Sequence, residues 1–156
     1  MTKLKVGDKA PEFKLHSTEK KEVSLTDFNG KPVVMLFFPL AFSGTCTAEL
    51  CNVRDEISYY NNLGVDVVAI SIDSVFTLAK FKEVENYNFT ILSDFNKDVS
   101  EAYDVLYETF AFGMKGVSKR AVFVLDKNHQ IQYIEEVANA GDMPDMAGLK
   151  NALTSI

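Results

Sequence analysis

Both cysteines of the chain lie within one short stretch, and no other part of the sequence offers comparable chemistry. Residues 31–51 read KPVVMLFFPLAFSGTCTAELC. The apolar run from Val33 to Phe38 has the length and composition of a fully buried strand. Pro39 ends that run, and Cys46 follows where a helical pattern begins. A strand that leads through a loop to a cysteine at a helix start is an arrangement that can make a thiolate.

Cys46 is placed to act as a nucleophile. A free thiol has a pKa near ~8.5, and only the thiolate attacks or binds metals. A helix start supplies unpaired N–H groups and the positive end of the helix dipole, and both favour an anion. Ser43 can cap the helix or direct its hydroxyl at whatever Cys46 attacks, and Pro39 can cover the sulfur without adding a donor. On position alone, Cys46 as a small buried hydrophobic residue is an equal alternative.

Cys51 falls on the other side of the same predicted helix. At 3.6 residues per turn, it lies about 140° round the helix from Cys46. The apolar positions lie within about 40° of Cys46: Leu50, Val53, Ile57 and Tyr60. A cysteine kept for packing belongs on that apolar face, so the position of Cys51 favours a redox role. The alternative is that a loop or another subunit covers it.

A bond between the two cysteines requires the helix to open. A spacing of five residues in an intact helix separates the Cα atoms by roughly 8–9 Å, beyond the ~7 Å that a disulfide tolerates. The first turns must therefore unwind before Cys46 and Cys51 can pair. The spacing also differs from C-x-x-C, which argues against a disulfide-exchange catalyst.

The remaining pattern predicts one α/β domain over residues 1–156. Short extended pieces at 13–15 and 22–25 precede the cysteine stretch, and strands are predicted at 65–72, 90–92, 121–125 and 130–137. Helices are predicted from Cys46 to about residue 63, from Ser74 to Val84, over 99–105, and from Pro144 to 155. The expected apolar positions of the second helix are Phe76, Ala79, Phe81 and Val84. This order predicts a mostly parallel central sheet flanked by helices, which the late hairpin makes mixed.

Composition narrows the class of partner and the location. A net charge of −6 over 156 residues argues against a nucleic acid or an anionic membrane as partner. No segment approaches the ~18 apolar residues of a membrane span, and the N-terminus has no apolar signal region. We therefore expect a soluble, cytoplasmic protein. His16 and His129 lie far from the cysteines in sequence, so we expect no metal site and no cofactor.

The residues from Pro39 to Cys46 resemble the peroxiredoxin signature of Pro, three residues, Thr or Ser, two residues and Cys. The longer run FFPLAFSGTCTAEL resembles the AhpE-like and bacterioferritin-comigratory-protein branch of thiol peroxidases. KVGDKAPEFKL is similar to the opening of the family, ILSDFNKDVSEAYDV to its middle, and KRAVFVLD, which holds Arg120, to its late strand. The resemblance covers most of the chain in the same order.

The resemblance implies a thioredoxin-like fold and thiol-dependent reduction of hydrogen peroxide and organic hydroperoxides. Cys46 would be the peroxidatic cysteine, which becomes a sulfenic acid. Arg120 would stabilise the thiolate and the charge on the peroxide oxygens, because a guanidinium is always cationic and offers several donors. Ser43, with the backbone N–H groups of Thr45 and Cys46, would position the peroxide. Without the resemblance, Arg120 would be interpreted as a solvated loop residue.

Two further residues take roles from the resemblance. Glu49 stands at the usual acidic position of the family and would orient an arginine, for which Arg54 is another candidate. Cys51 matches the position of the resolving cysteine in the second branch, which implies an intramolecular disulfide with Cys46 and thioredoxin or a similar dithiol as reductant. A homodimer of the A type, built near the active-site loops, is the expected assembly.

Three alternatives stay open. Cys51 can be idle in a one-cysteine peroxiredoxin whose Cys46 is resolved by an external thiol. Oxidation of Cys46 can instead serve as a signal in a non-enzymatic redox-sensing or binding protein. The loop around Phe110 and Phe112 can cover the active site, form the dimer face or belong to the core.

Overall fold

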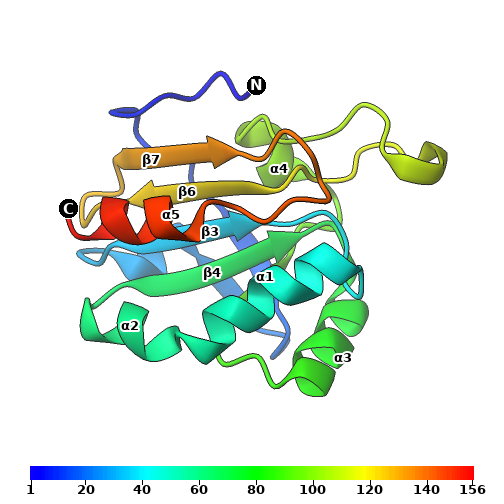
Figure 1. Cartoon of the computed structure of the whole chain (residues 1–156), viewed down its shortest axis with the longest axis horizontal. Coiled ribbons are helices and arrows are strands. Elements are labelled where there is room, and N and C mark those ends of the chain that lie inside the picture. Colours follow the sequence, from blue (N-terminus) through cyan, green and yellow to red (C-terminus); the bar gives the residue numbers. More distant parts are fainter.

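The computed structural model describes residues 1–156 and has one seven-stranded sheet at its centre (Figure 1). The strands in chain order are β1 (Lys14–Ser17), β2 (Glu22–Ser24), β3 (Val33–Phe37), β4 (Asp66–Ser71), β5 (Thr90–Ser93), β6 (Ala121–Leu125) and β7 (Ile131–Glu136). In space their order is β2-β1-β5-β4-β3-β6-β7. The predicted α/β class and the predicted late hairpin are both confirmed.

The sheet is mixed, but the expectation that it is mostly parallel is wrong. Only β3–β4 and β4–β5 are parallel, whereas the other four pairings are antiparallel. The difference arises at the two sides of the sheet, where the β1–β2 hairpin joins β5 and the β6–β7 hairpin joins β3, each in the antiparallel sense. The three parallel strands form the middle, and β3, buried along its whole length, leads to Cys46.

Helices cover both faces of the sheet. The five α-helices are α1 (Gly44–Asp55), α2 (Ile57–Asn62), α3 (Val75–Glu85), α4 (Asp98–Ala102) and α5 (Met146–Leu153). Helices α1, α2, α3 and α5 pack on one face, and α4 packs on the other with the chain that leads into β1. Alternate residues of β3 point to the two faces, so each face has its own apolar core. None of the helices has the length and apolar run needed to cross a bilayer.

The helix predictions need three corrections. The helix expected to run on to about residue 63 is broken at Glu56, whose φ of −109° and ψ of 18° are not helical, so α1 and α2 are separate. In α3 the buried side chain near its start is Leu78, whereas Phe76 is 74% exposed. Pro144 precedes α5, and Asp145 is its N-cap, accepting a hydrogen bond from the Gly148 N–H.

Candidate active site

Cys46 is the third residue of α1, directly beyond the carboxyl end of β3. Ser43 is the N-cap, with an extended backbone, and its carbonyl accepts the first helical bond from the Thr47 N–H at 3.0 Å. The Ser43 side chain does not cap the helix. Its hydroxyl donates to the Leu40 carbonyl at 2.7 Å. The N–H groups of the first turn are therefore not occupied by a side-chain cap.

Arg120 lies against the Cys46 sulfur. The residue is only 1% exposed, so the alternative of a solvated loop arginine is wrong. Its Nη2 donates to Cys46 Sγ at 3.3 Å and to the Ala140 carbonyl at 2.9 Å. Its Nη1 donates to Glu49 Oε1 at 2.7 Å. A guanidinium with three fixed acceptors cannot rotate freely, so the cation is held at the sulfur.

Burial and close contact change the pKa values of Glu49 and Arg120. Glu49 is fully buried, and burial raises its pKa to about 7 although the neighbouring Arg120 acts to lower it. Burial acts to lower the pKa of Arg120, but the adjacent Cys46 and Glu49 raise it by more, to above its usual value. Arg120 therefore stays charged and donates hydrogen bonds to both the Glu49 carboxyl and the Cys46 sulfur. Glu49 Oε2 and Arg120 Nε have no hydrogen-bond partner, which indicates a tightly enclosed group.

A cavity of about 320 Å³ opens beside this group and gives access to it. Its lining comes from the loop before α1, the first residues of α1, the loop before β6 and the loop after β7: Pro39, Leu40, Ser43, Gly44, Thr45, Phe110, Ala111, Arg120, Ala140 and Gly141. The first turn of α1 and the loop after β7 are tied together across the cavity, because Thr45 Oγ1 donates to the Gly141 carbonyl at 3.1 Å. Cys46 itself is fully buried, so Arg120 is the charged group that faces the opening.

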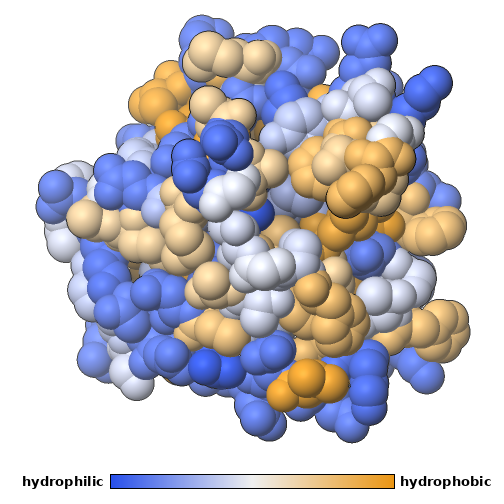
Figure 2. Space-filling model, turned by 45° about the vertical axis from the view of Figure 1, so that its right-hand side comes forward, coloured by the Kyte–Doolittle hydropathy of each residue, from blue (hydrophilic) through white to orange (hydrophobic).

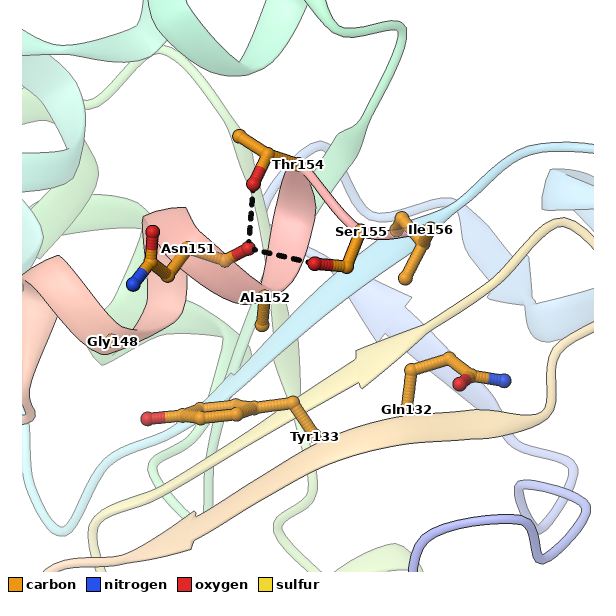
Figure 3. A pocket seen from close by; sticks show the side chains of 8 residues that line it. All are labelled: Gln132, Tyr133, Gly148, Asn151, Ala152, Thr154, Ser155 and Ile156. Atoms are coloured by element: carbon orange, nitrogen blue, oxygen red, sulfur yellow. Dashed lines mark hydrogen bonds between the residues drawn. The ribbon is translucent and has the colours of Figure 1, made fainter.

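The largest cavity, about 510 Å³, lies elsewhere, between β7 and α5 (Figure 3). Figure 3 shows Tyr133 on the strand and Asn151 and Thr154 on the helix side, with the Thr154 and Ser155 hydroxyls bonded to the Asn151 carbonyl. It is lined by no cysteine, histidine or charged side chain. Its size therefore does not make it the reactive site, and the smaller cavity beside Arg120 is the candidate.

Cys51 lies apart from this group, on the opposite side of α1. Both cysteines are free thiols, and Cys51 is partly buried. Its Sγ donates to Glu85 Oε2 at 3.5 Å and lies 3.8 Å from the Tyr87 hydroxyl. The cover comes from the end of α3 and the residues after it. Arg54 also faces this side, where its Nη1 is 3.9 Å from Glu85 Oε2.

Comparison with known proteins identifies the family. Residues 6–134 match the AhpC/TSA family. Peroxiredoxin Bcp of Escherichia coli K12 is 38% identical over 136 residues, which cover 86% of this chain and 86% of that protein. The chain belongs to the AhpC/TSA family. It is a peroxiredoxin, and thus a thiol peroxidase, similar to the Bcp proteins, as the sequence resemblance predicted.

Solved structures agree. The crystal structure of peroxidoxin BcpB from Mycobacterium tuberculosis superposes with a TM-score of 0.87 at 27% identity and covers 98% of both chains. A peroxiredoxin-like protein from Aquifex aeolicus gives a TM-score of 0.88 at 29% identity, over 97% of this chain and 87% of the other. The predicted thioredoxin-like fold is confirmed.

The structure of this peroxiredoxin brings together most of the residues singled out from the sequence. Cys46, Arg120 and Glu49 are in direct contact, and Pro39 and Ser43 line the adjoining cavity. Arg54, the further candidate for Glu49, is not its partner, because it pairs instead with Asp55 and Glu85. Three contacts had no signal in the sequence: the Ala140 carbonyl on Arg120, and the side chains of Glu85 and Tyr87 at Cys51. All three come from distant parts of the chain.

Proposed function

We propose that Cys46 is the peroxidatic cysteine of this peroxiredoxin and that it reduces hydrogen peroxide and organic hydroperoxides. The observation that carries the proposal is the 3.3 Å contact from Arg120 Nη2 to Cys46 Sγ. A charged guanidinium in a buried site, combined with the positive end of α1, stabilises negative charge at the reacting sulfur. Glu49 and the Ala140 carbonyl hold the guanidinium in place, and a neighbouring cavity gives a peroxide access.

The first step follows from this geometry. The Cys46 thiolate attacks one peroxide oxygen, the O–O bond breaks, and sulfur becomes a sulfenic acid. The other oxygen takes a proton and leaves as water or an alcohol. Negative charge develops on that oxygen near Arg120 and the N–H groups of Thr45 and Cys46, where donors already in place stabilise it. The Ser43 hydroxyl stands at the cavity and can accept a hydrogen bond from the peroxide, and Pro39 forms its wall.

The second step gives Cys51 the role of resolving cysteine. Its thiol attacks the sulfenic sulfur of Cys46, a disulfide forms, and water leaves. Thioredoxin or a similar dithiol then reduces the disulfide. Both cysteines lie in α1, which must unwind locally for the sulfurs to meet, and the first turn of α1 has no side-chain cap to hold it. The competing cycle leaves Cys51 idle and uses an external thiol.

Intact mass after oxidation tests the cycle. One equivalent of peroxide should remove two hydrogens from the protein and block both Cys46 and Cys51 against alkylation. A sulfenic acid at Cys46, with Cys51 still alkylatable, would instead support the one-cysteine cycle. Cys51→Ser should still be oxidised by a single equivalent of peroxide but lose turnover with thioredoxin. Cys46→Ser should lose both reactions.

Stopped-flow kinetics separates the enzyme from the redox-sensing alternative. The second-order rate constant of Cys46 with hydrogen peroxide should exceed that of a free cysteine thiolate by several orders of magnitude, because charge stabilisation acts on the transition state. A rate constant no better than that of the free thiolate would support a sensor or binding protein.

A homodimer built through the active-site face is the assembly that we propose. Phe42 is 52% exposed and Phe112 is 98% exposed, and both adjoin residues that line the cavity beside Arg120. Figure 2 is turned by 45° from Figure 1, and apolar side chains gather on the right-hand part of the face that it shows. Sedimentation should give a dimer that Phe112→Asp dissociates.

A cytoplasmic location fits a site that depends on free thiols.

A further inference from the structure

Tyr87 holds the turn of α1 that separates the two cysteines. Its hydroxyl donates to the Thr47 carbonyl at 3.3 Å and lies 3.8 Å from Cys51 Sγ. The residue is only 4% exposed. Its ring packs against Phe81 and Phe89, with centroid distances of 5.0 and 5.5 Å. The hydroxyl is therefore presented to α1 from a fixed position.

Glu85, the last residue of α3, and the residues that join α3 to β5 reinforce the contact. The Glu85 carboxylate accepts the hydrogen bond from the Cys51 thiol at 3.5 Å. The Glu85 carbonyl accepts from Arg54 Nη1 at 2.6 Å, and Asn88 Nδ2 donates to the Arg54 carbonyl at 3.3 Å. This side of α1 is thus bound to one segment through backbone and side chains alike.

The bond to Thr47 has a direct effect on unwinding. In an α-helix the carbonyl of residue 47 also accepts the N–H of residue 51, so it belongs to the turn that must open before Cys46 and Cys51 can pair. When that turn opens, the carbonyl moves away and the Tyr87 hydroxyl is left buried without its partner. Leaving a buried donor unsatisfied costs free energy. The contact therefore favours the wound helix over the unwound one.

We propose that Tyr87 and Glu85 are positioning residues of the resolving step. Their hydrogen bonds to Thr47 and Cys51, called the latch below, must break before Cys51 can react, and so they set how fast Cys51 attacks the oxidised Cys46. This inference rests on the proposed role of Cys51. In the step itself the Cys51 thiol attacks the Cys46 sulfenic acid, the S–S bond forms, and the thiol proton leaves with the hydroxyl group as water. While the latch holds, a second peroxide can oxidise the sulfenic acid to a sulfinic acid and depart as water or an alcohol.

The competition between these two fates gives a measurable quantity. The peroxide concentration at which half of Cys46 ends as sulfinic acid equals the ratio of the resolving rate constant to the overoxidation rate constant. Mass spectrometry of the protein after a single turnover, without thioredoxin and over a range of peroxide concentrations in large excess over the protein, measures that half-point. Stopped-flow measurement of the first step is made in parallel, so that a shift is assigned to the correct step.

Tyr87→Phe removes the hydroxyl and keeps the ring. The half-point should rise about three- to tenfold, the range given by one hydrogen bond of ordinary net strength. Amide hydrogen exchange over residues 47–51 of the reduced protein should accelerate by a similar factor. Glu85→Gln keeps an acceptor for the Cys51 thiol and should raise the half-point by less than Tyr87→Phe.

Tyr59→Phe is the matched control, because the Tyr59 hydroxyl also donates to a backbone carbonyl at 3.3 Å, that of Lys150, away from Cys51. Its half-point should equal that of the wild type. An unchanged or lower half-point in Tyr87→Phe, or an equal rise in Tyr59→Phe, would contradict the proposed role of the latch in the resolving step. A wild-type protein that forms no disulfide would overturn the proposed role of Cys51 instead. In that case the amide exchange rates of residues 47–51 would still test whether the Tyr87 hydrogen bond stabilises this turn.

Discussion

The two sides of α1 present the same chemical groups in different surroundings. Each cysteine lies beside an arginine paired with a glutamate. On the Cys46 side, Arg120 and Glu49 are 2.7 Å apart, and their side chains are 2% and 0% exposed. On the Cys51 side, Arg54 and Glu85 are 3.9 Å apart, and their side chains are 27% and 28% exposed. The difference therefore lies in burial and geometry and not in composition.

This difference decides what each pair can do. Removing one partner of a buried ion pair leaves an uncompensated charge and typically costs about 3–5 kcal/mol, whereas an exposed pair contributes about 0–1 kcal/mol. The buried pair can fix a cation against a sulfur and stabilise charge in a reaction that excludes water. The pair of Arg54 and Glu85 is only partly buried, and it forms weaker contacts that a local unwinding can break and remake. One helix thus combines a rigid reactive site with a releasable one.

The largest effect is expected when Arg120 is replaced by lysine and compared with the same replacement of Arg54. Arg120→Lys keeps the charge, but a single ammonium cannot bond to Cys46, Glu49 and the Ala140 carbonyl in the present geometry. We expect the stopped-flow rate constant with peroxide to fall by about a hundredfold or more, the usual loss for one donor at a developing oxyanion. Arg54→Lys is the matched control and should keep that first-step rate constant within about twofold. Equal losses in both variants would contradict the contrast between the two sides.

The position of Cys46 could be predicted from the sequence because the signals are local. A continuous apolar run gives β3, and a spacing of 3.6 residues places Cys46 with Leu50 and Val53 on the buried face of α1. The β6–β7 hairpin likewise follows from a turn between two apolar runs. These features depend on residues within a few positions of one another, which is where hydrophobic periodicity carries information.

The surroundings of both cysteines could not be derived from such patterns. Arg120 is 74 positions from Cys46, and Glu85 is 34 positions from Cys51. Only the family resemblance indicated the first contact, and nothing indicated the second. Periodicity also fails where an apolar residue is exposed, as at Phe76, because burial depends on which sheet strands lie beneath the helix. The direction of the added hairpins, and thus the share of parallel pairings, is likewise set by long-range packing.

A second effect, on stability and not on the reaction rate, is expected from Glu49, and it appears as a pH dependence. Burial raises the pKa of Glu49 from 4.5 to about 7, so the folded protein binds this proton more tightly than the unfolded chain. The resulting stability is fully present below about pH 4.5 and is lost as the pH rises through 7, by about 3 kcal/mol in total. Glu49→Gln should remove this part of the pH dependence of the unfolding free energy, measured with urea under reducing conditions.

Glu85→Gln is the control for that measurement. It leaves Glu49 and Arg120 intact, so the unfolding free energy should fall between pH 4.5 and pH 8 as it does in the wild type. If the difference in unfolding free energy between the wild type and Glu49→Gln stays constant over this interval, Glu49 does not take up its proton more tightly in the folded protein. The two sides of α1 would then be more alike in their electrostatics than their burial indicates.

The smallest expected effect concerns the first turn of α1, on the side of Cys46. Thr45 Oγ1 donates to the Gly141 carbonyl at 3.1 Å, an exposed contact that unwinding of this turn must also break. Thr45→Val keeps the branched shape and removes the donor, so unwinding should become easier by only about twofold, the low end for a neutral hydrogen bond. The half-point of overoxidation should rise accordingly, and by less than in Tyr87→Phe, because the Tyr87 bond is the better shielded from water. A larger shift in Thr45→Val than in Tyr87→Phe would mean that the first turn, held from the loop after β7, limits the meeting of the two sulfurs.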